Sequence, residues 1–229
     1  MLSIIVPTYN EMAHGDLQAI LASLADIPDT EILCVDSGST DDTLDCINTH
    51  NTRLIQINET SRAARLNAGV ANAQGDVILL YHPRILIAQH GIEALQQEPS
   101  ITWGGFTHQF THWHPLLRFI SWYSNHVRFK RKHIVYLDHG IFFHKRLGEQ
   151  VFPISDEPIF EDTELSWRLS ALTPPRRLQH TALVSPIRFL KNGPVRQFLG
   201  NQLLKLCFHL GVNPKRLNDW YERGLRLNG

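Results

Sequence analysis

Short hydrophobic runs alternate with amphipathic stretches through the first half of the chain. Polar or turn-forming residues bound the runs, as is typical of buried strands, and apolar residues spaced three and four apart between the runs are typical of helices. The predicted strands cover residues 2–6, 31–35, 53–57, 77–81 and 102–110. The predicted helices cover residues 17–27, 41–48, 62–73 and 89–97. This alternation predicts an α/β fold whose mostly parallel central sheet is flanked by helices.

The second half of the chain is less regular and is richer in helices. The predicted helices cover residues 115–131, 161–172, 195–210 and 214–225, and one predicted strand covers residues 140–144. The helix at 195–210 is amphipathic, and its apolar stripe consists of Phe198, Leu199, Leu203, Leu206 and Leu210. Because the sequence has no repeat, low-complexity segment or linker, we expect one domain. Residues 1–190 would form its body and residues 191–229 a C-terminal helical extension.

Composition and charge restrict the class of protein. Hydrophobic residues make up 43% of the 229 residues, which is ordinary for a globular protein with a core. The 22 basic and 22 acidic residues balance, so nothing favours non-specific binding to nucleic acid. The cysteines Cys34, Cys46 and Cys207 form neither a CxxC pair nor a metal-binding spacing. A reducing, cytoplasmic location is therefore expected.

No part of the sequence predicts a membrane span. The apolar residues 2–6 are too few for a signal peptide, and no stretch approaches the ~20 apolar residues that a span needs. The basic run at 128–132 closes the helix at 115–131, and such a run is most often a solvated helix end. Contact with a membrane surface or with phosphate is the alternative. The membrane surface is favoured by the nearby aromatic residues Trp113, Phe119, Trp122, Tyr123 and Phe129.

Two polar turns follow predicted strands of the same sheet. Asp36 comes directly after the strand at 31–35, and a turn with Gly38 leads from it into the next helix. The segment at 3–11 has the same design of strand, polar turn and helix. Ligands of open α/β sheets bind at the carboxyl ends of strands, so two such turns side by side would make a pocket. A plain strand–turn–helix connection is the alternative interpretation.

Five segments of the chain carry a resemblance to a known family. In order they are IIVPTYNE at 4–11, VDSGSTDDT at 35–43, SRAARLNAG at 61–69, GDVILL at 75–80 and FEDTELSWRL at 160–169. Together they resemble a family 2 glycosyltransferase with the nucleotide-sugar-binding fold called GT-A. The resemblance runs from residue 2 to about residue 190, and LGVNPKRL at 210–217 is similar to the end of a small bacterial subgroup. It implies that residues 1–190 bind a nucleotide sugar and transfer the sugar.

The donor side of the implied site lies in the first three segments. A nucleotide base needs an acceptor for its ring N–H, and the carboxylate of Asp36 supplies one at the end of a strand. The opposing wall of the base and ribose pocket would be formed by Pro7, Thr8, Tyr9 and Glu11, with Gly38 in the facing turn. Tyr9 as an ordinary surface aromatic residue is the alternative.

The third segment supplies candidate phosphate ligands. Arg62 and Arg65 lie at the start of a helix, where their charge and the helix dipole both favour phosphate. Asn67 and Gly69 lie on the same helix. Asn67 is a candidate substrate contact, and close packing of the helix on a strand is an equally good interpretation of both residues.

Glu161 and Asp162 are the candidate catalytic residues. Sugar transfer needs a base that takes the proton of the acceptor hydroxyl as this attacks the anomeric carbon. In the resembled family the aspartate of a Glu-Asp pair does this and transfer inverts the anomeric centre, which implies Asp162 as base with Glu161 in support. An acidic first turn that merely stabilises its helix, by up to ~1 kcal/mol, is the alternative.

The sequence departs from the family at the end of the strand at 77–81. The family has an acidic Asp-x-Asp motif there, which binds a divalent ion against the donor diphosphate. In this chain Arg84 takes the position of the metal aspartate, with His82 two residues earlier, and a guanidinium has no lone pair for a metal. Either Arg84 replaces the ion with a fixed charge, or the protein binds without turnover. A Mg or Mn site that uses His82, Asp138 and His139 is a further alternative.

The expected function is therefore a glycosyltransferase of the hexosyltransferase type. Its donor would be a nucleoside diphosphate sugar, expected to be a UDP-sugar, and the sequence leaves open whether the acceptor is a glycan, a lipid or a small molecule. We expect it in the cytoplasm, free or peripheral at the inner membrane. A catalytically silent nucleotide-sugar-binding protein is the main alternative. A nucleotidyltransferase is disfavoured because no Gly- and Arg-rich phosphate loop occurs near the N-terminus.

Overall fold

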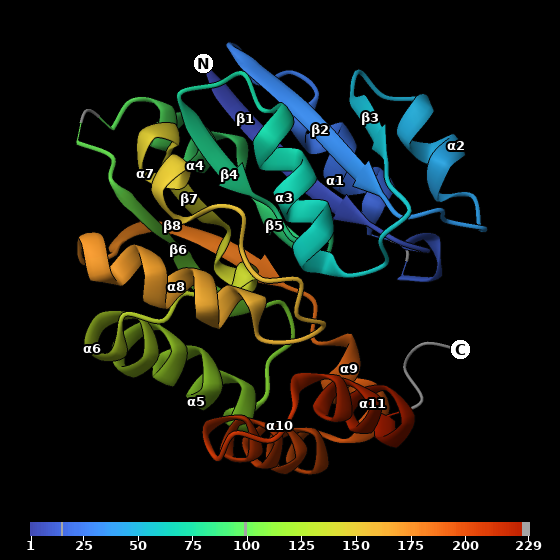
Figure 1. Cartoon of the computed structure of the whole chain (residues 1–229), viewed down its shortest axis with the longest axis vertical. Helices are drawn as coiled ribbons and strands as arrows, with labels where there is room; N and C mark the ends of the chain where they lie inside the picture. The colour runs from blue at the N-terminus through green and yellow to red at the C-terminus, as the bar shows by residue number, and fades with distance from the viewer. Residues whose placement is uncertain (15, 99, 226–229) are drawn as a thin grey trace.

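The computed structural model describes residues 1–14, 16–98 and 100–225 and contains one twisted eight-stranded sheet flanked by helices (Figure 1). The strand order is β3-β2-β1-β4-β7-β6-β8-β5. The first four strands in the sequence form the parallel part of the sheet, in the order β3-β2-β1-β4. They are β1 (Leu2–Thr8), β2 (Thr30–Asp36), β3 (Arg53–Gln56) and β4 (Val77–Leu80). The helices that connect or follow them are α1 (Leu17–Leu24), α2 (Thr43–Asn48), α3 (Arg62–Asn72) and α4 (Gln89–Gln96). The predicted α/β class and these elements are confirmed.

The other strands mix the two directions. They are β5 (Ile85–Ile87), β6 (Trp103–Phe110), β7 (Ile141–His144) and β8 (Arg176–Val184). β7 is antiparallel to β4 and β6, β8 is parallel to β6, and β5 is antiparallel to β8. The sequence pattern missed β5 and β8. β5 has only three residues, and β8 contains the polar residues Arg176, Arg177, Gln179 and His180, which weaken the apolar signal of a strand.

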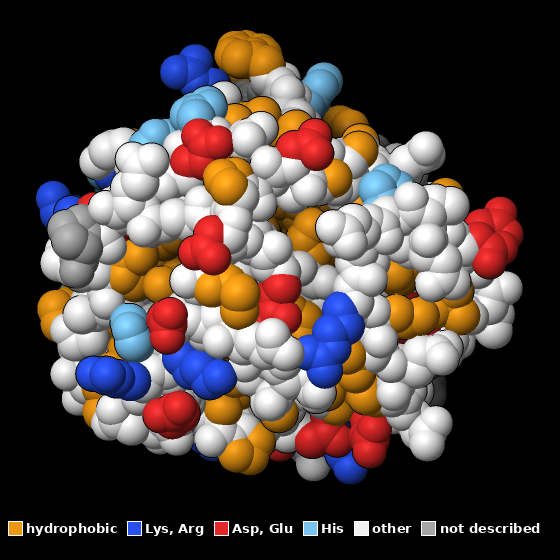
Figure 2. Space-filling view, turned by 90° about the horizontal axis from the view of Figure 1, so that it is seen from above, with side chains coloured by type: hydrophobic (Ala, Val, Ile, Leu, Met, Phe, Trp, Pro, Cys, Tyr) orange, Lys and Arg blue, Asp and Glu red, His pale blue; other side chains and the backbone are white. Residues whose placement is uncertain are grey.

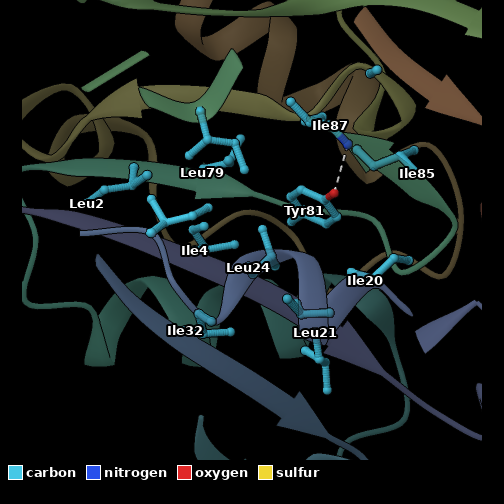
Figure 3. Close-up of a cluster of buried hydrophobic side chains, with 14 of the residues drawn as sticks. Leu2, Ile4, Ile20, Leu21, Leu24, Ile32, Leu79, Tyr81, Ile85 and Ile87 are labelled. Atoms are coloured by element: carbon cyan, nitrogen blue, oxygen red, sulfur yellow. Dashed lines mark hydrogen bonds between the residues drawn. The ribbon is translucent and has the colours of Figure 1, made fainter. Parts of the chain in front are cut away.

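Both faces of the sheet are covered, so the apolar residues of its strands are buried on either side. Figure 3 shows one core cluster, where Leu21 and Leu24 of α1 pack against Ile4 of β1 and Tyr81. The Tyr81 hydroxyl accepts a hydrogen bond from the Ile87 amide at 3.0 Å, which satisfies this buried polar group. A second cluster, which includes Leu66 of α3, occupies the other side.

Close packing fixes α3 against the sheet. A Cβ atom on Gly69 would lie 2.3 Å from Cγ2 of Ile5 in β1, so only glycine allows this approach. The side chain of Ser61 caps the helix by accepting a hydrogen bond from the Ala64 amide at 2.9 Å. The packing interpretation of Gly69 is confirmed, and it places the first turn of α3 at the carboxyl ends of β1 and β2 (Figure 1).

The predicted helix at 115–131 is three consecutive pieces. They are α5 (Pro115–Tyr123), a π-helix labelled η2 (Ser124–Phe129) and α6 (Lys130–Lys132). The wider π turn buries Ser124, Asn125 and Arg128. Sequence periodicity did not reveal this interruption, and such π segments frequently occur at functional sites.

The remaining helices follow in the last third of the chain. They are α7 (Lys145–Val151), α8 (Glu161–Leu172), α9 (Ile187–Asn192), α10 (Pro194–His209) and α11 (Pro214–Leu225), and two 3₁₀ turns are η1 (Met12–His14) and η3 (Leu137–His139). α7 and α9 were missed, and α8, α10 and α11 agree with the prediction. α9, α10 and α11 lie together beyond the sheet, with α10 beside α5 (Figure 1). The proposed extension at 191–229 would begin inside α9.

Two properties of the surface bear on partners. Among the helices of the described ranges, none combines the length and hydropathy of a membrane span. Figure 2 shows the molecule from above, at the end far from α10, where acidic, basic and hydrophobic side chains are interspersed. This face therefore has no large region of one charge, in line with the equal numbers of acidic and basic residues.

Candidate active site

A cavity of about 1160 Å³ lies at the carboxyl ends of β1 and β4. One wall comes from the turns after these strands and from the first turn of α3. The opposite wall comes from α5, η2, the start of α8, α9 and α10. Pockets for drug-sized ligands have volumes of about 300–1,000 Å³, so this cavity is large enough for a nucleotide sugar and part of an acceptor.

The structure brings most of the predicted site residues to this cavity. Those on its walls are Pro7, Tyr9, Glu11, Arg62, Arg65, His82, Arg84, Asp138 and Asp162. The other predicted residues do not line the cavity. They are Thr8, Asp36, Gly38, Asn67, His139 and Glu161. Gly38 is exposed, Asn67 is partly buried and the rest are buried. Asn67 is hydrogen-bonded to the backbone of Ile154, through Nδ2 to its carbonyl and Oδ1 to its amide, both at 2.9 Å.

The two polar turns lie side by side and are linked through Asp36. The Asp36 carboxylate is fully buried and accepts hydrogen bonds from the Ser39 amide at 2.7 Å, the Ser39 hydroxyl at 2.6 Å and the Thr8 hydroxyl at 2.9 Å. Asn10 adds a bond from its own amide to Ser39 Oγ, at 2.9 Å, and accepts one from the Thr40 amide at 2.8 Å. Asp36 thus holds the two turns together from behind the cavity wall. Gly38 has a φ of 77°, a conformation that favours glycine in this turn.

Arg62 and Arg65 both face the cavity from α3 but differ in their partners. The Arg62 guanidinium is ion-paired with Glu161, whose side chain is fully buried. Burial alone would lower the pKa of Arg62, but Glu161 and Asp162 raise it above its ordinary value. Arg65 donates to the Ser37 hydroxyl at 2.9 Å and has no carboxylate partner within the described residues. Its Nε is buried without an acceptor, and its side chain lines the cavity without a carboxylate that would neutralise its charge.

Arg84 lies at the position of the expected metal aspartate and pairs with Glu11. Arg84 Nε is 3.4 Å from Glu11 Oε2, and both side chains are largely buried. Burial raises the pKa of Glu11, and Arg84 opposes that shift. His82 accepts a hydrogen bond from the Arg84 amide at its Nδ1, 3.1 Å away. Burial, with Arg62 and Arg84 nearby, lowers the pKa of His82 well below its usual range, so its ring is neutral.

These residues do not fit a divalent cation. A guanidinium occupies the position of the expected ligand, and the nearest carboxylate, that of Glu11, is paired with it. No group of three or more His, Cys, Asp and Glu side chains in the described ranges is arranged to hold a metal. On the side of the two turns and α3, the positive charge that the cavity presents to an anion comes from Arg62, Arg65 and Arg84.

Asp162 lies on the cavity wall in the first turn of α8. Its Oδ2 accepts a hydrogen bond from the Leu137 amide at 3.2 Å. Burial and the neighbouring Glu161 raise the pKa of Asp162 to about 7, against the effect of Arg62. A carboxylate with such a pKa is able both to take and to release a proton near neutral pH.

Asp138 and His139 belong to a buried polar network. Asp138 Oδ2 is 3.4 Å from Nε2 of His108, a residue that the sequence did not single out. Burial would raise the pKa of Asp138, but His108 and His139 hold it well below its ordinary value. His139 contacts Ser124 Oγ at 2.8 Å and the Phe106 carbonyl at 2.8 Å, and burial lowers the pKa of His139 to about 4. His139 is therefore neutral and turned away from the cavity.

Three more residues complete the wall opposite the two turns and α3. The sequence indicated none of them individually, although Arg128 belongs to the basic run. The Arg128 guanidinium lies 4.2 Å from the ring centroid of Tyr136, and the Lys205 ammonium of α10 lies 5.6 Å from the same centroid. They come from three separate segments, η2, the loop before η3, and α10, so only the fold brings them together.

Solved structures with the same fold include glycosyltransferases. The TarS fragment 1–349 of S. aureus has a TM-score of 0.63 at 18% identity, covering 83% of this chain and 62% of TarS 1–349. The same fragment in complex with UDP-GlcNAc has a TM-score of 0.64 at 18% identity, covering 80% of this chain and 58% of the other. A third structure is glucosyl-3-phosphoglycerate synthase of Mycobacterium tuberculosis in complex with Mn²⁺, UDP and glucosyl-3-phosphoglycerate. Its TM-score is 0.57 at 16% identity, and the match covers 79% of this chain and 70% of the synthase.

These similarities show the fold, and this chain spans about three fifths of the length of TarS 1–349. No curated protein matches the sequence. The family model described as Glycosyl transferase family 2 matches residues 3–146. The matched region contains both polar turns, α3 and the altered segment around Arg84. Since the match covers more than half of the chain, this protein belongs to glycosyl transferase family 2.

Proposed function

We propose that the protein transfers a sugar from a nucleoside diphosphate sugar, specifically a UDP-sugar, to an acceptor hydroxyl. The observation that carries the proposal is Asp162, a carboxylate with a pKa of about 7 that faces the same cavity as Arg65 and Arg84. The cavity thus combines a base with cations suited to a diphosphate. Structures of the same fold in complex with UDP-GlcNAc and with UDP support the choice of donor.

The donor would lie along the wall made by the two turns and α3. Pro7 and Tyr9 contact the base and ribose. The Asp36 carboxylate is fully buried behind this wall, so its part in binding the base is to hold the turns of Thr8 and Ser39 together through the three hydrogen bonds that it accepts. Arg65 and Arg84 bind the diphosphate, and His82 supplies a neutral ring beside it.

The reaction assigned to the cavity is a single displacement. The acceptor oxygen attacks the anomeric carbon while the bond between this carbon and the diphosphate oxygen breaks, and the configuration inverts. Asp162 takes the proton of the acceptor hydroxyl. The arginines stabilise the negative charge that develops on the nucleoside diphosphate. Glu161 acts on Arg62 and Asp162 rather than on the substrate, because it lies behind the wall.

A catalytically silent nucleotide-sugar-binding protein is the second candidate. The Arg84–Glu11 pair favours it, since the pairing reduces the charge available to a leaving group. Both candidates bind the donor, and only the first consumes it. None of the cavity features described above favours a nucleotidyltransferase.

The test has two stages. A thermal-shift screen of UDP, UDP-GlcNAc and UDP-glucose, with GDP and ADP as controls, identifies the nucleotide, because a ligand at ~100 times its dissociation constant adds about 2.7 kcal/mol to the free energy of unfolding. Release of UDP from the bound sugar nucleotide is then followed in chelator and in excess Mg²⁺ or Mn²⁺. Binding with UDP release that Asp162→Asn abolishes supports the transferase. Binding without release supports the silent protein, and no binding of any nucleotide would reject both.

We further propose peripheral contact with a membrane through α10 and α5, on the cytoplasmic side of the inner membrane. Four leucines of the predicted stripe, Leu199, Leu203, Leu206 and Leu210, are 56–74% exposed, whereas Phe198 is half-buried. Phe119 and Trp122 of α5 are exposed, and the basic residues of α6 follow after η2. Exposed apolar side chains flanked by basic ones suit an anionic lipid surface.

A further inference from the structure

The second set of cations in the cavity lies away from the donor wall. Lys205 and Arg128 lie against the ring of Tyr136, with their charged groups 5.6 Å and 4.2 Å from its centroid. All three side chains line the cavity, on the side formed by η2 and α10. Cations over the face of a tyrosine ring are stabilised only modestly, so this ring does not neutralise two positive charges.

Neither cation has an ion-pair partner among the described residues. Arg128 donates to the Ser124 hydroxyl at 3.0 Å, and no carboxylate in the described ranges lies within 4.0 Å of Arg128 or Lys205. The nearby acids have other partners: Asp138 faces His108, and Asp162 accepts from the Leu137 amide. Burial and Arg128 lower the pKa of Lys205 to about 8. Arg128 is buried and Lys205 is half-buried, so their charges are costly without a counter-ion, and a bound anion would remove that cost.

The place of these cations determines what they would bind. The diphosphate of a donor already has Arg62, Arg65 and Arg84 on its own wall. Lys205 and Arg128 lie on the opposite wall, where Asp138 and Asp162 both act electrostatically on Lys205. An anion held there is close to the base and separate from the donor phosphates.

We propose that Lys205 and Arg128 bind an anionic group, phosphate or carboxylate, on the acceptor. The term acceptor rests on the proposed transferase function, whereas the anion site does not. Asp162 is then positioned to take the proton of a hydroxyl on the same molecule. The apolar side chains beside the cations, Phe119, Ile120, Phe198 and Leu204, would accommodate a lipid chain if the anion were a lipid headgroup.

The site is tested with small probes that differ in charge. Glycerol 3-phosphate, glycerate and glycerol are titrated by calorimetry into the protein saturated with UDP, which occupies the donor side. The same titrations are made without UDP. The variants are Lys205→Gln, Lys205→Arg as the charge-conserving control, and Lys191→Gln as a control for an exposed lysine of α9 outside the cavity. Circular dichroism checks that each variant is folded.

We expect the two anions to bind and glycerol not to bind. Lys205→Gln should weaken anion binding at least tenfold, while Lys205→Arg and Lys191→Gln should change it less than threefold. Anions that bind no better than glycerol, or equally well to Lys205→Gln, would overturn the inference. If UDP does not bind but Lys205-dependent anion binding persists, the proposed donor fails and the anion site stands. Dodecyl phosphate, used below its micelle concentration, distinguishes the sources, since a lipid headgroup site would bind it more tightly than glycerol 3-phosphate and a site for a soluble anion would not.

Discussion

The guanidinium of Arg84 is paired with the carboxylate of Glu11 on the cavity wall, with 3.4 Å between Arg84 Nε and Glu11 Oε2. The pair occupies the place where the family's metal motif is expected. Glu11 therefore competes with any diphosphate for Arg84. The charge that Arg84 offers a ligand depends on whether this contact opens, and burial, which raises the pKa of Glu11, favours its neutral form.

Substitution of Arg84 and substitution of Glu11 should change the affinity for UDP in opposite directions. Arg84→Gln should weaken UDP binding about tenfold to a hundredfold, because a charge-assisted hydrogen bond contributes about 1.5–3 kcal/mol, and it should leave uridine binding nearly unchanged. Glu11→Gln should strengthen UDP binding several-fold, since it frees Arg84. Calorimetry in chelator and in excess Mg²⁺ measures both effects. Arg118→Gln, an exposed arginine of α5, is the control. Strong metal dependence in the unmodified protein would show that Arg84 does not replace the ion.

Asp162→Asn should abolish transfer while preserving the fold and UDP affinity. General base catalysis contributes about 10²–10⁴-fold, so the rate of UDP release should fall by that factor. Glu164→Gln, in the same first turn of α8, is the matched control. It removes one negative charge from that turn, and Glu164 does not line the cavity. Equal losses from both substitutions would indicate that the acidic turn only stabilises its helix.

The rate of transfer should rise with pH and level off above about pH 7. Asp162 acts as a base only when ionised, and its pKa is raised to about 7. If Asp162→Asn has residual activity, its rate should show neither this rise nor this plateau between pH 5 and pH 9. A rate that is constant between pH 5 and pH 9 would contradict the assignment of Asp162 as base.

The same shift predicts how stability depends on pH. The folded protein binds the Asp162 proton more tightly than the unfolded chain, whose ordinary value is 3.8. The free energy of unfolding should therefore fall as pH rises from about 4 to about 7. Asp162→Asn removes this loss and should be more stable than the unmodified protein at pH 8, by at most a few kcal/mol, since one pKa unit is worth about 1.4 kcal/mol. Denaturant unfolding at pH 4, 6 and 8 measures it. A difference independent of pH would point to packing rather than ionisation.

Gly69→Ala should destabilise the protein by about 1–3 kcal/mol, because the added Cβ would overlap Cγ2 of Ile5 and push α3 away from β1. Displacement of α3 should also weaken UDP binding, since Arg62 and Arg65 are carried by this helix. Gly200→Ala is the matched control. Gly200 lies inside α10 with open space around its Cβ position, so alanine there should stabilise by about 0.5–1 kcal/mol. Equal effects of the two substitutions on the unfolding midpoint would contradict the close contact.

The protein should float with anionic vesicles at low salt and dissociate at high salt. The double substitution Leu199→Asp with Leu203→Asp should abolish flotation by placing charges on the exposed stripe of α10. Leu172→Asp, at an exposed leucine on the last turn of α8, is the control and should leave flotation unchanged. Absence of the unmodified protein from the vesicle fraction at low salt would favour a soluble acceptor and a protein that works free of membranes.

The sequence by itself determined the class of fold, the parallel strands and the family. The strands β1, β2 and β4 are runs of apolar residues, and a pattern of this kind depends on burial along one short segment. Tyr9 and Glu11 could likewise be predicted as cavity residues, because they follow a strand and parallel strands end at one edge of a sheet. β5 and the π-helix η2 were missed because three residues, or one widened turn, leave no periodic signal.

Only the tertiary structure decided which charges meet. Arg84 and Glu11 are 73 residues apart and Arg62 and Glu161 are 99 apart, and nothing in the local sequence of either residue selects its partner. The same is true of Lys205, whose charge has Tyr136 rather than a carboxylate beside it. Ion pairing and desolvation depend on distances of a few ångströms between distant segments, whereas hydrophobic periodicity is a property of neighbours along the chain. The pattern of residues therefore identified the cavity, and the fold decided which of its charges are paired and which are available to a ligand.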